Sequence, residues 1–274
     1  MNKILYISDL DGTLLDGSAQ ITAESAGLLN DFIASGGSFS VATARTAATA
    51  VIITRNVNIN VPVVLMNGVC VYDIASDEYV KIEQIPDDSL CSMLKVLKNF
   101  RLSGFMFSVR GNILDTYYEN TDSENARKFV EERTKKFGKV FTKVSSFEEC
   151  TERGIIYYSV TDTNTVLDPV YSALREIKGI HIDYYRDVYD ERFWYLEVSS
   201  AAASKYNAVM FLREKYGFDR VVGFGDNFND LPLFDACDET YAVSNAREEV
   251  KKRADGVIPP NTENGVARKI CGLL

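Results

Sequence analysis

The chain has 274 residues, of which 46% are hydrophobic and 25% are charged, a composition that is typical of globular proteins and excludes a disordered tail. Its 30 basic and 39 acidic side chains give a formal net charge of −9, which argues against nucleic acid or an anionic membrane surface as the main partner. The length exceeds what one compact core usually reaches, so we expect two domains or one domain with a large insertion.

Short β-rich apolar runs alternate with stretches of helical spacing, which indicates an α/β protein with parallel strands. In chain order, we predict a strand over 3–10, a helix over 23–35, a strand over 38–43, a helix over 47–55 and a strand over 62–66. The character then changes, with helices over 87–100, 123–136 and 165–178 and strands over 104–110, 113–118, 155–161, 180–185 and 193–198. The first pattern returns with a helix over 203–216, a strand over 220–225, a helix over 229–236 and a strand over 240–243. These elements predict a Rossmann-like parallel sheet core with helices on both faces, formed by residues 1–84 and 200–274, and an inserted α+β domain over 85–199.

The sequence contains no export or membrane signal that we can identify. No apolar stretch approaches the ~18 residues that a membrane span requires, and the apolar run over 4–7 is too short for the core of a signal peptide. The five cysteines are odd in number, widely scattered and free of any C-x-x-C spacing, which favours reduced thiols. We therefore expect a cytoplasmic protein with no membrane partner.

The first acidic cluster, Asp9-Leu10-Asp11-Gly12-Thr13, stands where the first predicted strand ends. Ligands of open parallel sheets collect beyond the carboxyl ends of the strands. Two carboxylates at alternate strand positions can face the same side, and Gly12 allows a sharp turn. A solvated acidic turn is the alternative interpretation of this cluster taken alone.

The second cluster, Gly225-Asp226-Asn227-Phe228-Asn229-Asp230, follows another predicted core strand. The glycines before it lack the third glycine of a dinucleotide loop, and Asp226 would repel a pyrophosphate. Carboxylates at the same end of two core strands suit a hard cation such as Mg²⁺. Asn229 and Asp230 can also cap the next helix, and we expect one of them to do both.

Two further residues complete the set. Thr43 ends the second predicted strand and can offer a hydroxyl and a backbone N–H to a phosphate oxygen, although it can also cap a helix. Lys205 lies near a helix start and before the second acidic cluster. A lysine at such a position is usually a surface charge, but among four carboxylates it would form an ion pair.

The order and spacing of these residues resemble the four motifs of the haloacid dehalogenase superfamily of aspartate-nucleophile phosphotransferases. The matching segments are Asp9–Thr13, Thr43, Lys205 and Gly225–Asp230. The chain is most similar to the Cof-type phosphatases, whose large α/β cap lies between the second and third motifs. Asn67-Gly68 looks like the Asn-Gly pair of that subfamily. The C-terminal signature of the subfamily is similar to three short segments of this chain, residues 242–246, 250–251 and 264–267. Tyr206 departs from the usual glycine after the lysine.

The resemblance implies a role for each matching residue. Asp9 would be the nucleophile that forms an aspartyl-phosphate, Asp11 the general acid and base, and Lys205 a fixed positive charge against Asp9. Mg²⁺ would be held by Asp9, the Asp11 carbonyl and Asp226. The remaining residues would bind the phosphate or substrate or support the site; they are Thr43, Arg45, Asn67 and Asn229, with Gly12 and Asp230 in support.

A Mg²⁺-dependent phosphatase of small phosphate monoesters, such as sugar phosphates or phosphorylated cofactor precursors, is the leading hypothesis. A carboxylate at position 11 favours hydrolysis of an aspartyl-phosphate, but a phosphomutase needs the same acid and base. A non-catalytic phospho-receiver or metal-binding module, and an acidic Ca²⁺ site without turnover, remain alternatives. We expect a small-molecule phosphate ester as partner, no nucleic acid, and a monomer or weak homodimer.

Overall fold

The computed structural model describes residues 3–187 and 190–274, without the side chains of residues 136 and 137. The chain divides into two compact units, Met1–Lys81 with Ser204–Leu274, and Ile82–Ala203. The expected junctions at 84/85 and 199/200 compare with 81/82 and 203/204 in the structure. Residues 1 and 2, which open the predicted core domain, lie outside the described residues. No helix in the described ranges is both long and apolar enough to cross a bilayer.

The first unit, which we call the core, is built on a parallel sheet with the strand order β14-β13-β12-β1-β2. Its central strands carry apolar side chains on both faces, as a sheet covered on both sides requires, and Leu5, Ile7 and Phe224 are fully buried. The five strands are β1 (Ile4–Ser8), β2 (Ser38–Val41), β12 (Arg220–Gly225), β13 (Glu239–Val243) and β14 (Gly256–Ile258). This is the expected Rossmann-like sheet.

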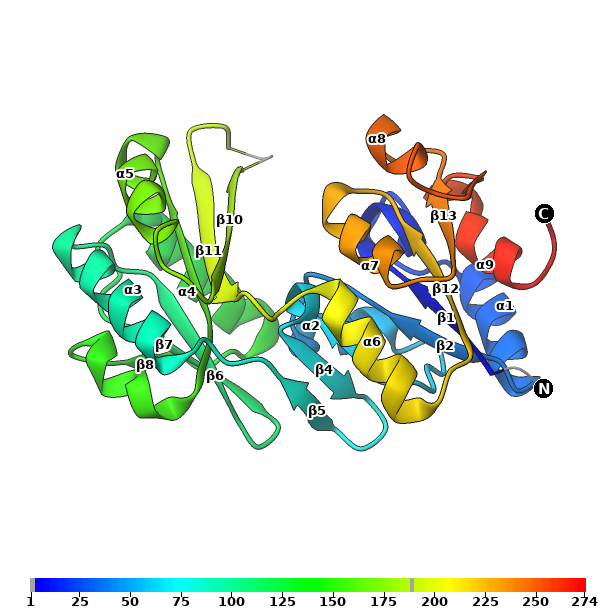
Figure 1. Cartoon of the computed structure of the whole chain (residues 1–274), viewed down its shortest axis with the longest axis horizontal. Helices are drawn as coiled ribbons and strands as arrows, with labels where there is room; N and C mark the ends of the chain where they lie inside the picture. Colours follow the sequence, from blue (N-terminus) through cyan, green and yellow to red (C-terminus); the bar gives the residue numbers. More distant parts are fainter. Residues whose placement is uncertain (1–2, 188–189) are drawn as a thin grey trace. The chain divides into compact units, whose positions relative to one another are not determined.

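The helices of the core follow from the strand order. From β1 the chain moves outward to β2 on one side of the sheet, and from β12 it moves outward to β13 and β14 on the other side. Because such crossovers are right-handed, the helices that connect the first set of strands lie on one face of the sheet and those that connect the second set lie on the other. Accordingly α1 packs against α9, whereas α6 packs against α7 (Figure 1). The core helices are α1 (Ala23–Ala34), α2 (Ala47–Thr54), α6 (Lys205–Tyr216), α7 (Leu231–Asp235), α8 (Glu248–Lys251) and α9 (Gly265–Ile270).

A small separate sheet, β3-β4-β5, was not expected: its first strand was predicted as part of the parallel core sheet but pairs antiparallel with β4. It comprises β3 (Val63–Leu65), β4 (Cys70–Asp73) and β5 (Glu78–Ile82), and it meets β2 through a single bridge between Ala42 and Val64. The loop between β3 and β4 is unusual because Met66, Asn67 and Gly68 all take positive φ angles of 51°, 55° and 101°. A Cβ on Gly68 would lie 2.1 Å from the Ser204 carbonyl oxygen. Only glycine therefore lets this loop pack against the start of α6.

The second unit, which we call the cap, contains a six-stranded sheet in the order β10-β11-β9-β6-β7-β8. Its apolar core joins one face of this sheet to α3 and α5, with Tyr158, Leu196 and Leu167 fully buried. Its helices are α3 (Asp87–Asn99), α4 (Glu124–Phe137) and α5 (Asn164–Leu174). Its strands are β6 (Phe105–Arg110), β7 (Ile113–Tyr118), β8 (Thr142–Lys143), β9 (Ile155–Asp162), β10 (Ile180–Arg186) and β11 (Trp194–Ser200). The mixed α and β composition expected for 85–199 is therefore present.

Candidate active site

The strand register brings the acidic clusters to one edge of the core sheet. Ser8 at the end of β1 pairs with Val41 of β2 and with Phe224 of β12, so these strands end level with one another. Asp9 comes directly after β1, and its N–H donates to the Phe224 carbonyl over 3.0 Å. Asp226 comes directly after β12. The direction in which the chain adds strands also reverses between β1 and β12. Ligands of such sheets bind beyond the carboxyl ends of the strands at this reversal.

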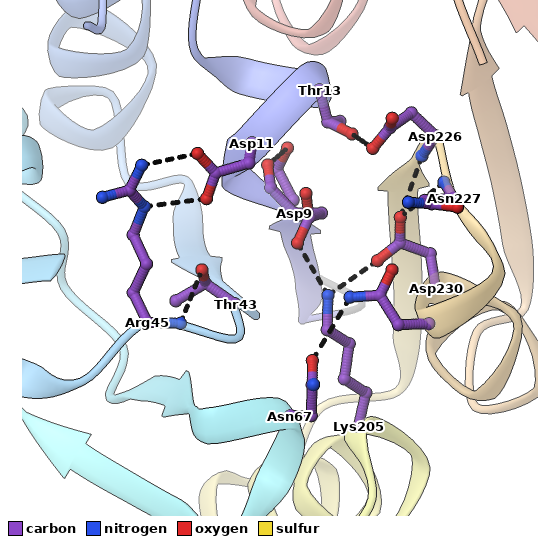
Figure 2. Close-up of polar contacts among 12 residues, drawn as sticks. Asp9, Asp11, Thr13, Thr43, Arg45, Asn67, Lys205, Asp226, Asn227 and Asp230 are labelled. Carbon is purple, nitrogen blue, oxygen red and sulfur yellow. Dashed lines mark hydrogen bonds and ion pairs between the residues drawn. The ribbon is translucent and has the colours of Figure 1, made fainter. Parts of the chain in front are cut away.

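Lys205 lies between two carboxylates of the core (Figure 2). Its ammonium group is 2.7 Å from Asp9 Oδ1 and 2.6 Å from Asp230 Oδ1, and all three side chains are almost fully buried. The position follows from the helix start, because the Ser204 hydroxyl accepts the Asn207 N–H over 3.0 Å and so begins α6 at Lys205. Tyr206 does not prevent this helix start.

Asp230 combines a capping contact with a contact to Lys205, whereas we expected it or Asn229 to combine capping with a place in the cation site. While Oδ1 accepts Lys205, Oδ2 accepts the backbone N–H groups of Asp226 and Asn227 over 2.9 and 3.0 Å. The predicted helix over 229–236 begins instead as a short turn, Phe228–Asp230, followed by α7. Since these bonds engage both of its oxygens, Asp230 orients Lys205 and the loop that carries Asp226.

Asp226 faces Asp9 across the turn that follows β1. One oxygen from each of Asp9, Asp226 and Asp230 lies within 4.8 Å of the others, a spacing that allows a shared metal ion. The Thr13 hydroxyl donates to Asp226 Oδ1 over 2.9 Å. A Cβ on Gly12, whose φ is 79°, would lie 2.6 Å from Asp226 Oδ2, so glycine is needed for this approach. These contacts hold the two clusters together at the sheet edge.

Burial and crowding of like charges shift the ionisation of these groups. Burial, together with the Asp230 carboxylate, raises the pKa of Asp9 well above its ordinary value, and Lys205 only partly opposes this. Burial and Asp230 also raise the pKa of Asp226 to about 6. For Lys205, burial alone would lower the pKa, but Asp9 and Asp230 outweigh burial and raise it. The ammonium therefore stays charged, and the carboxylates gain from any further cation.

Asp11 lies differently from the sequence prediction. As alternate residues of an extended strand, Asp9 and Asp11 could face the same side, but β1 ends at Ser8 and residues 10–14 form a turn. The Asp11 carboxylate instead accepts two bonds from Arg45, of 2.7 and 2.5 Å, and points away from Asp9 (Figure 2). The turn forms because Gly12 takes the left-handed conformation immediately after Asp11.

Thr43 is fully buried beside this pair. Its hydroxyl accepts the Arg45 N–H over 3.2 Å, and α2 begins only at Ala47, so the alternative of a helix cap for Thr43 is wrong. Asn67 and Asn229 contact each other, with the Asn229 amide donating to Asn67 Oδ1 over 3.3 Å. All ten candidate residues thus belong to the core and lie around the same edge of its sheet.

Sequence reasoning missed three supporting contacts from the C-terminal part of the core. The Asn245 amide donates to the Gly12 carbonyl over 2.8 Å, and the Arg247 N–H donates to the Asp226 carbonyl over 3.0 Å. Arg247 Nε also donates to Asn227 Oδ1 over 2.8 Å. Asn245 belongs to the segment 242–246, which resembles a family signature. That resemblance could have indicated that this segment contacts the site.

The model of haloacid dehalogenase-like hydrolases matches residues 6–270. The chain belongs to this family. The pyridoxal phosphate phosphatase YbhA of Escherichia coli (strain K12) is 23% identical over 268 residues, which cover 96% of this chain and 95% of that protein. The 5-amino-6-(5-phospho-D-ribitylamino)uracil phosphatase YitU of Bacillus subtilis (strain 168) is 21% identical over 272 residues, with 96% and 95% covered.

The solved structure of TM0651 from Thermotoga maritima has the same fold, with a TM-score of 0.80, 22% identity and coverage of 98% of this chain and 97% of that one. As a Cof-type member of the haloacid dehalogenase family, the chain is a phosphatase, a hydrolase of phosphoric monoesters. The sequence-based identification of the family and the predicted fold class are both confirmed.

Proposed function

We propose that this haloacid dehalogenase phosphatase hydrolyses small phosphate monoesters with Asp9 as nucleophile, through an aspartyl-phosphate, in a Mg²⁺-dependent reaction. The observation that carries the proposal is the buried ammonium of Lys205, 2.7 Å from Asp9 Oδ1, beside a group of three carboxylates within 4.8 Å. A carboxylate that attacks a phosphate dianion meets strong like-charge repulsion. Fixed cations at the attacking group offset that repulsion, and they do so best in a buried site.

The donor set fits Mg²⁺. Formally, the site holds four carboxylates and two cations: Asp9, Asp11, Asp226 and Asp230 against Arg45 and Lys205. All available donors are hard oxygens, which Mg²⁺ prefers. Because Asp230 is occupied by Lys205 and two N–H groups, Asp9 and Asp226 would hold the ion, together with the Asp11 carbonyl. When bound, Mg²⁺ would supply positive charge that offsets the repulsion between the Asp9 carboxylate and the phosphate.

The other residues divide the remaining work. Lys205 holds the Asp9 carboxylate in place through its ammonium group, which Asp230 in turn fixes. Thr43, buried at the end of the neighbouring chain segment, would hold a phosphate oxygen through its hydroxyl. The Asp11 carboxyl would give a proton to the leaving oxygen and then take one from the water that cleaves the acyl phosphate. Asn67 and Asn229 would contact the substrate at the rim.

The substrate would be a small soluble phosphate ester, either a sugar phosphate or a phosphorylated cofactor precursor. The two relatives named above are a pyridoxal phosphate phosphatase and a phospho-ribitylaminouracil phosphatase, at 23% and 21% identity. The chain is about equally identical in sequence to two phosphatases that act on different substrates. This supports the shared reaction and does not identify the group that is esterified to the phosphate. We further propose that the cap carries the residues that select the ester group.

We also propose a cytoplasmic enzyme that acts as a monomer or weak homodimer, without nucleic acid or membrane as partner. The five free cysteines and the net charge of −9 support this.

The test is phosphate release from a panel of monoesters with Mg²⁺ or with EDTA, for the wild type, Asp9→Asn and the surface control Asp31→Asn. We expect release that requires Mg²⁺, is abolished by Asp9→Asn and is unchanged by Asp31→Asn, which alters an exposed residue of α1. Full activity of Asp9→Asn would refute the nucleophile. An isomerised ester without free phosphate would instead indicate a phosphomutase.

A further inference from the structure

The ion pair between Arg45 and Asp11 has a geometry that the proposed reaction does not require. Arg45 Nε donates to Asp11 Oδ2 over 2.7 Å and Arg45 Nη2 donates to Asp11 Oδ1 over 2.5 Å, so the guanidinium grips both oxygens of the carboxylate. The pair lies at the edge of the site, with 25% of the Arg45 side chain and 53% of the Asp11 side chain exposed. Both oxygens of Asp11 are thereby engaged and point away from Asp9 (Figure 2).

The backbone of Arg45 is anchored at the phosphate-binding side of the site. Its N–H donates to the Thr43 hydroxyl over 3.2 Å and its carbonyl accepts the Met66 N–H over 3.1 Å. Only the long side chain reaches outward to Asp11. The guanidinium can therefore change direction without moving the strand ends that carry Thr43.

The two cations of the site differ in what holds them. Lys205 is enclosed by Asp9 and Asp230 and is almost fully buried, so it keeps its partners. Asp11, which binds the Arg45 guanidinium, is instead more than half exposed. A guanidinium binds carboxylates and phosphates with the same two-pronged geometry. A phosphoryl group beside Thr43 would therefore compete with Asp11 for the same N–H groups.

We propose that Arg45 exchanges partners during turnover. It pairs with Asp11 or with the bound phosphoryl group, and the arrival of phosphate releases the Asp11 carboxylate for proton transfer. Arg45 then contacts the phosphoryl group directly and also controls the position of the Asp11 carboxylate, so that phosphate binding is linked to the availability of the acid and base. This inference rests on the proposed phosphatase function, because it requires a phosphoryl group beside Asp9.

The exchange is tested by a double-mutant cycle of phosphate affinity. The dissociation constant of inorganic phosphate, with saturating Mg²⁺, is measured by calorimetry for the wild type, Arg45→Gln, Asp11→Asn and the double variant. Asp11→Asn keeps the backbone carbonyl and the shape of the side chain. Because the pair is exposed, an interaction of about 0.5–1 kcal/mol is expected, which corresponds to about two- to fivefold in affinity.

We expect Asp11→Asn to tighten phosphate binding about two- to fivefold more when Arg45 is present than when it is Gln. The simple loss of a negative charge near phosphate affects both backgrounds and cancels in the cycle. Arg45→Gln should weaken binding, and Arg45→Lys, which keeps the charge without the two-pronged geometry, should give an intermediate affinity. Thermal unfolding would check that each variant remains folded.

Several results would overturn the exchange. Equal effects of Asp11→Asn in both backgrounds would show that phosphate and Asp11 do not compete for Arg45. An unchanged affinity of Arg45→Gln would show that the guanidinium does not meet phosphate, and weaker binding by Asp11→Asn would show that Asp11 assists binding. If no variant, the wild type included, bound phosphate, the proposed function would fail together with the exchange. Additive effects with normal phosphate binding contradict the exchange alone.

Discussion

Replacing Lys205 by methionine tests whether the site depends on its buried ammonium group. Methionine has a similar length and no charge, so Lys205→Met leaves Asp9 and Asp230 without the partner that now lies 2.7 and 2.6 Å away. The Lys205 side chain is 1% exposed and the carboxylates are 7% and 0% exposed, so water cannot take its place. Removing one partner of a buried ion pair costs about 3–5 kcal/mol. We expect a loss in this range at neutral pH.

The loss should depend on pH in a direction that the structure determines. Lys205 lowers the pKa of Asp9, so its removal raises that pKa further in the folded state. A folded carboxyl that keeps its proton while the unfolded one ionises makes stability fall as pH rises. The deficit of Lys205→Met relative to the wild type should therefore shrink on acidification and grow again towards neutral pH.

Urea unfolding followed by far-UV circular dichroism measures this loss, with Lys215→Met as the matched control. Lys215 lies on the same helix but is exposed, so the same substitution there should change stability by no more than about 0.5 kcal/mol. Phosphatase activity of Lys205→Met should fall by about 100-fold or more. Wild-type stability in Lys205→Met, or a deficit that does not vary with pH, would refute the electrostatic account.

Three further predictions concern other contacts. Gly68→Ala should destabilise the core by more than about 3 kcal/mol in urea, because its Cβ would meet the Ser204 carbonyl at 2.1 Å at a φ of 101°, and a change below about 1 kcal/mol would contradict the packing. Thr13→Val removes the hydroxyl that donates to Asp226 and should raise the Mg²⁺ concentration for half-maximal activity about tenfold. An unchanged Mg²⁺ concentration would show that this hydrogen bond does not orient the Asp226 carboxylate. The hydrogen bond to Asp183 raises the pKa of His181 in the folded protein. The stability that this ion pair adds to the fold is therefore complete below about pH 6.5, the ordinary pKa of histidine, and is lost as the pH rises through the raised pKa. Proton NMR can follow this single histidine alone, and Asp183→Asn should lower its pKa; no change would refute the pairing.

The sequence predicted the parts of the site that depend on chain order in a parallel sheet. Asp9 and Asp226 each follow a buried strand, and adjacent parallel strands end at the same edge, so their proximity was foreseeable. The proximity of Asp9 and Asp226 needs only backbone topology, which the apolar runs and turn residues encode. The role of Lys205 came from the resemblance to the family, because a lysine near a helix start is by itself usually a surface charge.

The features that escaped prediction depend on side-chain directions or on rare backbone conformations. The turn at Gly12 directs Asp11 towards Arg45, and nothing in the local letters reveals that partner 34 residues away. The strands β4 and β5 were not predicted, and neither was the path of the loop before them, because Met66 and Asn67 take positive φ, which residues other than glycine seldom adopt. The support from Asn245 requires the C-terminal segment to fold over the first turn.

The order of the chain has a consequence for synthesis. Strand β1 pairs with β2, which follows soon after it, but its other neighbour, β12, is made only after the whole segment Ile82–Ala203. A ribosome therefore delivers the inserted unit as one continuous piece before the discontinuous unit has all its strands. Until Lys205 emerges, Asp9 has no buried counter-ion, so the candidate active site is among the last parts of the nascent protein to be completed.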